Sequence, residues 1–528
     1  MRVTIASRRS DLARVQAYQV GEALQIAHPQ IEINYSFHES LGDRNQNDPL
    51  WQMPEKGVFT QDFREGLLRG DFDLVVHSWK DLAIEETSET EVAATLPRAD
   101  ARDLLLVRED RWQKVLRTGV ITILTSSPRR SYNLESFLRE ALPAKLGEVK
   151  FTNVRGNVPT RVRKLLELDV DGLIVAKAAM DRLLEARQSE FDATREELRL
   201  ALSQCRWMVL PLRENPSAPA QGALAIEIVR RRADLRDLLA PLNCVDTFAA
   251  VTREREILRG HGGGCHQKIG ASVLLRPFGE ITFLRGLTDN GQVLDNCSLN
   301  AARPRPPRIP REQLWPLNSS ESDWFDRELI PVKPARQSEA LWIAKADALP
   351  DDWYPEADQI VWASGVQTWK RLARRGVWVH GSAESLGEHE PQQIETLAGR
   401  ELSWLKLTHA AGYDDGMVPT LATYRLKPKD GRVDLAGRKY FFWKSGSIFE
   451  RALAINPWLQ SMSHFCGPGN TQRILEKNGV DAHIFLDHAQ WLREMSESEW
   501  QDPVATTTPR GLPARGPRSV PGSDSGNG

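Results

Sequence analysis

Short apolar runs alternate with longer amphipathic stretches along the first half of the chain. A few consecutive apolar residues between polar ones predict a strand, and apolar residues that recur with helical spacing predict a helix. On this pattern we expect strands at 3–6, 74–77, 121–125, 173–176 and 224–229, and helices at 11–26 and 161–168. The alternation then loosens into 273–287, which is typical of antiparallel strands. The pattern predicts a multi-domain α/β protein.

The second half begins and ends with segments of unusual composition. Residues 301–338 contain Arg-Pro-Arg-Pro-Pro-Arg and further prolines, which favour an extended linker. Residues 499–528 are rich in Pro, Gly, Ser and Thr and carry almost no large apolar side chains, so we expect a disordered tail. The segment between them, 339–498, is then a further α/β domain.

A short pattern occurs twice in that domain. Thr368-x3-Leu372-x3-Gly376-Val377 recurs as Thr471-x3-Leu475-x3-Gly479-Val480. Each copy predicts a threonine-capped helix, a glycine stop and then a strand. Two paired α/β units would produce this pattern, as would a chance repetition of common residues.

The composition limits the class of protein. A chain of 528 residues is too long for one hydrophobic core. Its 69 Lys and Arg nearly balance 71 Asp and Glu, which gives no reason to expect nucleic acid or an acidic membrane as a partner, so any anion site must be local. The 5 cysteines form no CxxC pair, and no apolar run has signal-peptide or transmembrane character. We therefore expect a cytoplasmic protein without a metal site.

The first segment with candidate chemistry is Val75-Val-His-Ser-Trp-Lys-Asp81. It is a buried strand that ends in Ser78, Lys80 and Asp81. Ligands of α/β domains bind at the carboxyl ends of strands. The alternative is a solvated Lys–Asp ion pair.

Two further segments each follow a strand and open a helix. They are Thr125-Ser-Ser-Pro-Arg-Arg130 and Val154-Arg-Gly-Asn-Val-Pro-Thr-Arg161. Free backbone N–H groups, hydroxyls and guanidinium forks at such positions suit carboxylates or phosphates. A helix cap beside a surface arginine pair is the alternative. Together with Arg8, Ser10, Lys56 and Lys80 the segments indicate a cationic cleft for a small polyanion.

The fourth segment is His261-Gly-Gly-Gly-Cys265-His266. Three glycines allow a large group to approach Cys265, and the neighbouring side chains favour its thiolate. A flexible loop with an incidental thiol is the alternative. A metal site at His261, Cys265 and His266 is less favoured, because no further ligand pattern completes it.

In this order the segments resemble porphobilinogen deaminase, also called hydroxymethylbilane synthase, over residues 1 to about 300. The matching motifs are Ile5-Ala-Ser-Arg8-Arg-Ser10, Lys56-Gly-Val-Phe59, Val76-His-Ser-Trp-Lys80-Asp81, Thr125-Ser-Ser-Pro-Arg129-Arg130, Arg155-Gly-Asn157-Val-Pro-Thr-Arg161, Pro219-Ala-Gln-Gly-Ala223 and Gly262-Gly-Gly-Cys265. The resemblance implies two periplasmic-binding-protein-like α/β domains, 1–96 with 199–218 and 97–198. It implies a small α+β cysteine-bearing domain at 219–300.

The resemblance also implies the chemistry. Such an enzyme condenses four porphobilinogen units into hydroxymethylbilane, releases ammonia in haem biosynthesis, and carries a dipyrromethane cofactor, here through a thioether to Cys265. Asp81 matches the catalytic carboxylate that holds the pyrrole N–H and acts as acid and base. The residues implied for cofactor binding are Lys80, Ser126, Arg129 and Arg130, and those for substrate carboxylates are Arg8, Ser10, Ser127, Arg155 and Arg161. A monomer is expected.

Residues 339–498 resemble uroporphyrinogen III synthase, which closes hydroxymethylbilane into a ring. The motifs are Val361-Trp-Ala-Ser-Gly-Val-Gln-Thr368, Thr423-Tyr424-Arg425, Phe442-Trp-Lys-Ser445-Gly-Ser447 and Gly467-Pro-Gly-Asn-Thr471. Tyr424 and Thr471 match positions that line the cleft of that family. A second activity is thereby implied, and a degenerate domain that binds product or stabilises the first half is the alternative.

A solute-binding or sensor protein is the rival from another class. A two-domain cleft with anion-binding helix starts would serve a receptor equally well. Asp81 and Cys265 argue against it, because a carboxylate in an anion cleft repels the ligand and a receptor needs no thiol on a glycine loop.

Overall fold

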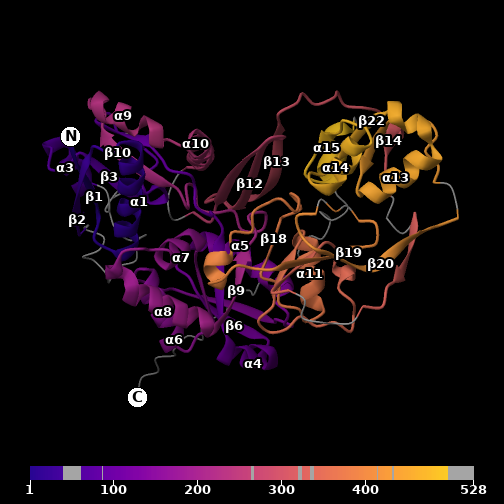
Figure 1. The fold of residues 1–528 in the computed structure, drawn as a ribbon, viewed down its shortest axis with the longest axis horizontal. Helices are drawn as coiled ribbons and strands as arrows, with labels where there is room; N and C mark the ends of the chain where they lie inside the picture. The colour runs from indigo at the N-terminus through magenta and orange to yellow at the C-terminus, as the bar shows by residue number, and fades with distance from the viewer. Residues whose placement is uncertain are drawn as a thin grey trace, which may run out of the picture.

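The structure is a computed structural model. It describes residues 1–39, 61–85, 87–262, 267–318, 324–332, 338–412, 414, 416–430 and 433–496. Figure 1 shows the first half of the chain on one side, the orange and yellow second half on the other, and the strands β12 and β13 between them. Within the described ranges, every helix is too short or too polar to cross a membrane.

The first sheet has the order β2-β1-β3-β10-β4. Strands β1, β2 and β3 are parallel, and β10 is antiparallel to β3 and β4. Alternate residues of these strands, among them Val3, Ile5, Leu74 and Val76, pack into one core beneath the first helix. The predicted strands at 3–6, 74–77 and 224–229 and the helix at 11–26 are confirmed. The elements are β1 (Arg2–Arg8), α1 (Asp11–Ala27), β2 (Glu32–His38), α3 (Gln61–Arg69), β3 (Leu74–Ser78), β4 (Thr90–Ala94), β10 (Leu224–Val229) and α9 (Ala233–Leu239).

The second sheet has the order β7-β6-β8-β5-β9. Strands β6, β7 and β8 are parallel, and β5 is antiparallel to its neighbours β8 and β9. The strands predicted at 121–125 and 173–176 and the helix at 161–168 are confirmed within a few residues. The elements are β5 (Asp103–Arg108), α4 (Glu109–Thr118), β6 (Val120–Leu124), α5 (Pro128–Ala141), β7 (Glu148–Thr152), α6 (Val158–Glu167), β8 (Gly172–Ala176), α7 (Lys177–Leu184), α8 (Asp192–Ser203) and β9 (Cys205–Leu210).

The sheet topology differs from the domain boundaries that we expected. Residues 199–218 do not join the first sheet, because β9 pairs with β5 along its whole length. Strand β10, expected in the third domain, lies in the first sheet between β3 and β4. The chain therefore crosses between the two sheets at 95–102 and again at 211–223, and we call these segments the first and second crossover.

The third unit consists of α10 (Val245–Gly260) and an antiparallel sheet. Its strands are β11 (Gly270–Arg276), β12 (Gly279–Leu287) and β13 (Val293–Ala301), which confirms the antiparallel strands predicted over 273–287. The buried carboxylate of Glu254 ties the unit to both crossovers. It accepts hydrogen bonds from the Arg98 guanidinium at 2.7 and 2.9 Å and from the backbone N–H of Ala220 at 2.8 Å.

The second half contains two more sheets, with the orders β15-β20-β19-β16-β17-β18 and β14-β21-β22-β23. The elements are β14 (Leu314–Trp315), β15 (Phe325–Leu329), β16 (Ala340–Ile343), β17 (Ile360–Ala363), α11 (Val366–Arg374), β18 (Gly381–Ser382), α12 (Glu395–Ala398), β19 (Trp404–His409), β20 (Thr420–Pro428), β21 (Tyr440–Trp443), α13 (Gly446–Ile455), β22 (Ser463–Cys466), α14 (Asn470–Lys477), β23 (His483–Ile484) and α15 (His488–Met495).

The linker expected at 301–338 is wrong from Ile309 onward among the described residues, whereas 302–308 form no helix or strand and are mostly exposed, as expected. Strand β14 pairs with β21 and β15 pairs with β20, while Ile309, Leu314, Trp315 and Trp324 are buried. These apolar side chains gain more from burial than the prolines gain from an extended form. We therefore call residues 309–496 the C-terminal region. The expected tail at 499–528 lies outside the described residues.

The repeated pattern has the same local structure in both copies. Helices α11 and α14 are each followed by a left-handed glycine, Gly376 with φ 84° and Gly479 with φ 74°, and then by a buried valine and a short strand. The glycine stops are confirmed because only a residue without Cβ adopts this conformation readily. The threonine caps are wrong, since Gly365 and Gly469 occupy the N-cap positions.

The two halves pack against each other, and three of the hydrophobic core clusters each contain side chains of both. The edge strands β9 and β18 adjoin, and the N–H of Val209 donates to the carbonyl of His380 at 2.7 Å. Helix α11 packs against α5, and α12 packs against α7 (Figure 1). We call this contact surface between the halves the seam. Within it, the indole N–H of Trp369 on α11 donates to the carbonyl of Ala141 on α5 at 3.0 Å. The two halves are therefore packed closely against each other along this contact.

Candidate functional site

Asp81 stands at the carboxyl end of the central strand of the first sheet. After β3 the chain makes one 3-10 turn, Trp79–Asp81. Trp79 is buried and packs edge to face on Phe248 of α10, with ring centroids 5.1 Å apart. This anchor leaves the Asp81 side chain exposed beyond the strand end. The prediction that the strand ends at these residues is confirmed.

The two predicted helix starts lie at the carboxyl ends of strands of the second sheet, since α5 follows β6 and α6 follows β7. Ser127 is the N-cap of α5 and accepts from the N–H of Arg130, and Asn157 caps α6 by accepting from the N–H of Thr160 at 2.9 Å. The two loops are joined, because the Ser126 hydroxyl donates to the carbonyl of Val154 at 2.6 Å and accepts its N–H at 2.9 Å. The loops therefore form one edge with two helix N-termini.

Arg129 and Arg130 do not form a surface pair. Both are buried around the carboxylate of Asp103, the first residue of β5. Arg129 Nη2 lies 2.8 Å from Oδ2, and Arg130 Nη2 and Nε lie 2.6 and 3.0 Å from Oδ1 and Oδ2. Asn215 and Gln221 donate to the same carboxylate, both at 2.8 Å. Burial alone would raise the pKa of Asp103, but the charges of Arg130 and Arg129 hold it well below its usual range.

Gln221 connects this cluster to the end of the first sheet. Lys80 Nζ donates to Gln221 Oε1 at 3.4 Å, while Gln221 Nε2 donates to Asp103. Burial lowers the pKa of Lys80, with Asp81 opposing the shift and Arg130 and Arg161 adding to it. Burial also lowers the pKa of Arg161 to about 10, and Asp81 opposes that shift as well. The structure thus brings Lys80, Asp81, Arg130 and Arg161 within reach of one another's charge.

The remaining predicted ligands surround the same edge. Arg8 ends β1, and Ser10 is the N-cap of α1 without a side-chain capping bond. Because β1 and β3 are parallel neighbours, their carboxyl ends lie side by side. Among the described residues, Arg155 Nη2 is a buried guanidinium nitrogen without a hydrogen-bond partner. An unpaired buried donor of this kind fits an anionic ligand.

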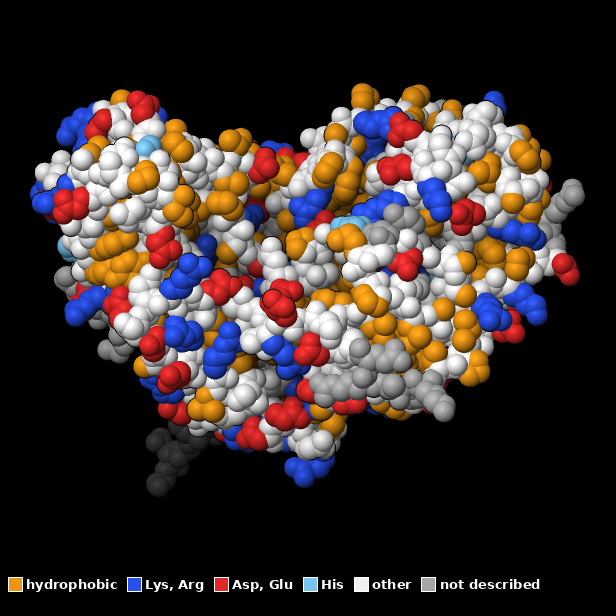
Figure 2. Space-filling model, viewed as in Figure 1, with side chains coloured by type: hydrophobic (Ala, Val, Ile, Leu, Met, Phe, Trp, Pro, Cys, Tyr) orange, Lys and Arg blue, Asp and Glu red, His pale blue; other side chains and the backbone are white. Residues whose placement is uncertain are grey.

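The excess of positive charge around Asp81 is a local feature, because charges of both signs are mixed over the visible surface (Figure 2). Figure 2 shows Lys and Arg side chains interspersed with Asp and Glu over the visible face, without a broad patch of one sign. Around Asp81, by contrast, Lys80, Arg130, Arg155 and Arg161 outnumber the carboxylates Asp81 and Asp103. A cationic edge with one exposed carboxylate can hold a polyanion and move a proton on it.

The predicted cysteine lies outside the described residues. These residues end at Gly262, two positions after α10, and resume at Gln267, so Cys265 and His266 fall between them. Gly262 has φ 93°, a conformation that favours glycine. Lys56 also lies outside the described residues.

Comparisons with known proteins match the first half of the chain. Residues 3–237 match the family model "Porphobilinogen deaminase, dipyromethane cofactor binding domain". A porphobilinogen deaminase from Acidothermus cellulolyticus is 36% identical over 304 residues, 54% of this chain and 82% of the relative. One from Desulfitobacterium hafniense is 36% identical over 270 residues, 51% of this chain and 79% of the relative. The chain belongs to the porphobilinogen deaminase family.

Two solved structures are more distant neighbours of this family member. Uroporphyrinogen-III synthetase from Helicobacter pylori is 14% identical and covers 32% of this chain and 88% of its own, with a TM-score of 0.23. A putative periplasmic sulfonate-binding protein from Methylobacillus flagellatus is 10% identical and covers 49% and 69%, with a TM-score of 0.25.

The predicted residues of the second half lie near the junction of its two sheets. Tyr424 is fully buried between the Arg327 guanidinium, 4.6 Å from its ring, and the ring of His409 at 5.7 Å. His409 ends β19, and its Nε2 lies 3.1 Å from the hydroxyl of Ser447 on α13 in the other unit. Thr471 lies in the first turn of α14, which packs against α13. The sequence pattern did not single out His409.

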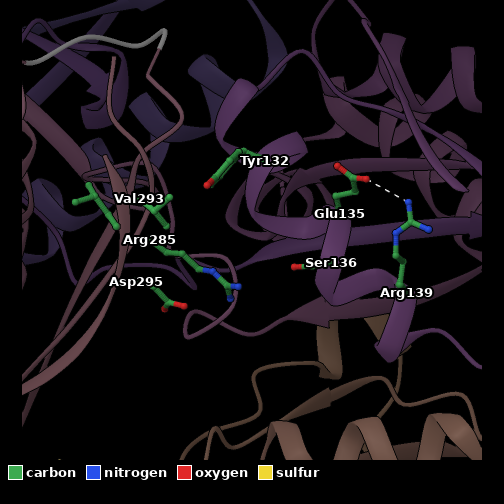
Figure 3. Close-up of a pocket in the computed structure, with 8 residues that line it drawn as sticks. Tyr132, Glu135, Ser136, Arg139, Arg285, Val293 and Asp295 are labelled. Atoms are coloured by element: carbon green, nitrogen blue, oxygen red, sulfur yellow. Dashed lines mark hydrogen bonds and ion pairs between the residues drawn. The ribbon is translucent and has the colours of Figure 1, made fainter. Parts of the chain in front are cut away.

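A separate hollow of about 350 Å³ lies between α5 and the third unit. Figure 3 shows the α5 side chains on one side of it and those of β12 and β13 on the other. Its lining includes none of the predicted site residues and consists of Tyr132, Glu135, Ser136, Arg139, Arg285, Val293, Leu294 and Asp295. The hollow is therefore distinct from the edge that carries Asp81.

Proposed function

We propose that this chain condenses porphobilinogen into hydroxymethylbilane with release of ammonia. The single observation that carries the proposal is the position of Asp81, an exposed carboxylate coupled in charge to Lys80 and Arg161 at a cationic edge. Every porphobilinogen unit brings an acetate and a propionate, so a growing chain needs repeated contacts to guanidinium, ammonium and hydroxyl groups. Arg8, Ser10, Ser127, Arg155 and Arg161 supply them in this proposal.

Asp81 is the proposed acid and base. Its carboxylate oxygens can accept a hydrogen bond from the pyrrole N–H and stabilise positive charge on the substrate as ammonia leaves. Its exposure gives the substrate access to both oxygens. Lys80, with its pKa lowered by burial, lies beside it and contacts substrate or cofactor carboxylates in this arrangement.

The residues present fit a dipyrromethane. The family model covers its binding domain, and the unpaired Arg155 Nη2 is a donor that an acidic pyrrole side chain would satisfy. We propose that Cys265 holds the group through a thioether and that Lys80, Ser126, Arg129 and Arg130 surround it. Once bound, the dipyrromethane supplies the terminal pyrrole carbon to which substrate units are joined. Asp103 keeps the two arginines in place, and Ser126 keeps the two loops together.

The test is the intact mass of the protein after incubation with porphobilinogen, beside a Cys265→Ser variant. We expect additional mass equal to a dipyrromethane in the parent and none in the variant. A Cys205→Ser variant is the matched control and should carry the added mass. A parent that stays unmodified and consumes no porphobilinogen would leave the anionic-solute binding protein as the better account.

A second activity, uroporphyrinogen III synthase, is proposed for the C-terminal region. It is favoured by the meeting of Tyr424, His409 and Ser447 at the junction of the two α/β units, where a ligand would contact both. The test is the isomer formed from hydroxymethylbilane: type III in the parent and type I in a Tyr424→Phe, His409→Gln double variant. Type I from the parent itself would favour a domain that only supports the first half.

Size-exclusion chromatography with light scattering tests the expected monomer, and fractionation of cells tests the expected cytoplasmic location.

A further inference from the structure

A carboxylate of the C-terminal region holds the start of the second crossover. Glu384 follows β18 and is 9% exposed, with a left-handed backbone at φ 53°. Its Oε1 accepts the N–H of Leu212 at 2.8 Å, and its Oε2 accepts the N–H of Arg213 at 2.7 Å. A buried carboxylate with both oxygens bonded to consecutive backbone N–H groups fixes the position of that peptide.

The crossover then runs directly into the candidate site. Asn215 lies two residues beyond Arg213; its amide donates to Asp103 at 2.8 Å and accepts from Arg129 at 2.9 Å. Gln221 lies further along and links Asp103 to Lys80. A displacement of the peptide at 212–213 would therefore be passed to the amides that set the positions of Arg129, Asp103 and Lys80.

The same crossover has a second attachment to the C-terminal region. Lys370 on α11 lies 3.3 Å from the carboxylate of Glu214, which also pairs with Arg285 of β12. Lys370 is nearly buried over the ring of Phe137, 5.8 Å away. Such a partly buried pair restrains Glu214 more than a surface pair would.

The first crossover is held as well. Arg102 immediately precedes Asp103, and its Nη2 donates to the carbonyl of Gln392 at 2.7 Å. The guanidinium also lies over the ring of Trp362, 5.5 Å from its centroid. Gln392 and Trp362 both belong to the C-terminal region, so this region contacts the chain on either side of the Asp103 cluster.

We propose that the C-terminal region positions the deaminase site through the two crossovers, with Glu384 as the principal positioning residue. The inference rests on the proposed condensation of porphobilinogen for its kinetic part only. It assigns the C-terminal region a role in the first reaction whether or not that region has an activity of its own. In this proposal Glu384 is a positioning residue that acts through Leu212, Arg213 and the amides of Asn215 and Gln221.

The experiment uses the full-length protein with Glu384→Gln and Glu384→Ala. The amide of Gln retains one acceptor and Ala retains none, so the effects should be graded. Backbone hydrogen exchange at 215–223, beyond the two directly bonded N–H groups, should quicken from parent to Gln to Ala. The kcat for porphobilinogen should fall in the same order, by about tenfold to a hundredfold for Ala, since small displacements of catalytic groups are costly. KM should change by less than about threefold, because the side chains that bind the substrate carboxylates are retained.

Glu390→Gln is the matched control. Glu390 also lies in the C-terminal region and pairs with the first half, through Arg276 at 2.6 Å, but it touches neither crossover. We expect exchange at 215–223 and kcat as in the parent. The proposal would be overturned if Glu384→Ala leaves hydrogen exchange at 215–223 unchanged. It would also be overturned if exchange quickens in Glu384→Ala while its kcat stays equal to that of Glu390→Gln.

Lys370→Met provides a second variant in case Glu384→Ala does not fold. It removes the contacts with Glu214 and with Glu140 of α5 while keeping an apolar stem against Phe137. It should show a smaller change in exchange at 215–223 and in kcat, in the same direction. A parent that consumes no porphobilinogen would contradict the proposed function. The exchange series would still confirm or overturn the mechanical link between Glu384 and 215–223.

Discussion

Arg130 forms a bidentate ion pair with Asp103, in which Nη2 lies 2.6 Å from Oδ1 and Nε lies 3.0 Å from Oδ2. This two-point contact fixes the guanidinium plane relative to the first residue of β5. Arg129 and Arg130 leave an excess positive charge over the one carboxylate, and all three side chains are buried. The cluster therefore serves both the fold and the cationic character of the edge beside Asp81.

Replacing Asp103 with Asn should destabilise the protein by about 3–5 kcal/mol, because two buried guanidiniums would lose their counter-charge. The free energy of unfolding from urea titration measures this loss. Asp110→Asn is the matched control, since Asp110 pairs with Arg108 but its side chain is 62% exposed, and we expect a loss below about 1 kcal/mol. Equal effects of the two substitutions would show that the Asp103 pairing contributes little.

Replacing Asp81 with Asn should lower kcat by about a hundredfold to ten-thousandfold and leave the melting temperature nearly unchanged. The amide keeps the shape of the carboxylate but removes its charge and its ability to accept a proton, and the exposed side chain contributes little to packing. Steady-state consumption of porphobilinogen and a thermal melt measure the two quantities. Asp246→Asn, at an exposed position in the first turn of α10, should alter neither. A kcat within about threefold of the parent would remove Asp81 from the chemistry.

The positions of the strands and of the loops that follow them could be predicted from the sequence. Strands buried in parallel sheets consist of continuous apolar runs, and helix starts need particular capping residues. Asp103, Asn215 and Glu384 could not be predicted in the same way. Each is an ordinary polar residue locally. Asn215 and Glu384 bond to partners more than 100 residues away in the sequence. Asp103 of β5 pairs with Arg129 and Arg130 of α5, beyond an intervening helix and strand, a contact that only the folded chain makes. Gln221 lay inside a recognised motif, yet its link between Lys80 and Asp103 needed the folded chain.

The error over the later part of the expected linker, from Ile309 onward, has a different origin. Prolines there exclude helix and disfavour central strands, and composition alone then favours a solvated linker. The signal against it was the presence of Ile309, Leu314, Trp315 and Trp324 within that segment. Such large apolar side chains in a proline-rich stretch indicate a chain that packs along a neighbouring surface.

Trp369 should be essential to the seam between the halves. It is 0% exposed, packs edge to face on Phe137 at 5.5 Å, and donates its indole N–H to Ala141. Trp369→Ala should cost about 3–5 kcal/mol of unfolding free energy and quicken hydrogen exchange in α5 of the first half. Trp458→Ala, at a position 43% exposed, should cost less than about 1 kcal/mol. Unchanged exchange in α5 would mean that the two halves are stabilised independently.

His380 should make the same seam sensitive to acid. Burial, with the charge of Arg206 adding to it, lowers the pKa of His380 to about 3 from an ordinary value of 6.5. Its Nδ1 accepts the N–H of Val361 at 3.1 Å and its ring packs on Trp207, so the folded protein keeps the imidazole neutral. The unfolded chain binds a proton below pH 6.5 and the folded one does not, so stability is lost as the pH falls from 6.5 toward 3. Between pH 7 and pH 5 this contribution amounts to about 2 kcal/mol at most.

In His380→Gln the loss of unfolding free energy over that interval should shrink by a comparable amount. His389→Gln changes an exposed histidine of the same region and should leave the pH profile of the parent unaltered. Parallel profiles for the parent and His380→Gln would contradict the assignment of acid sensitivity to the seam.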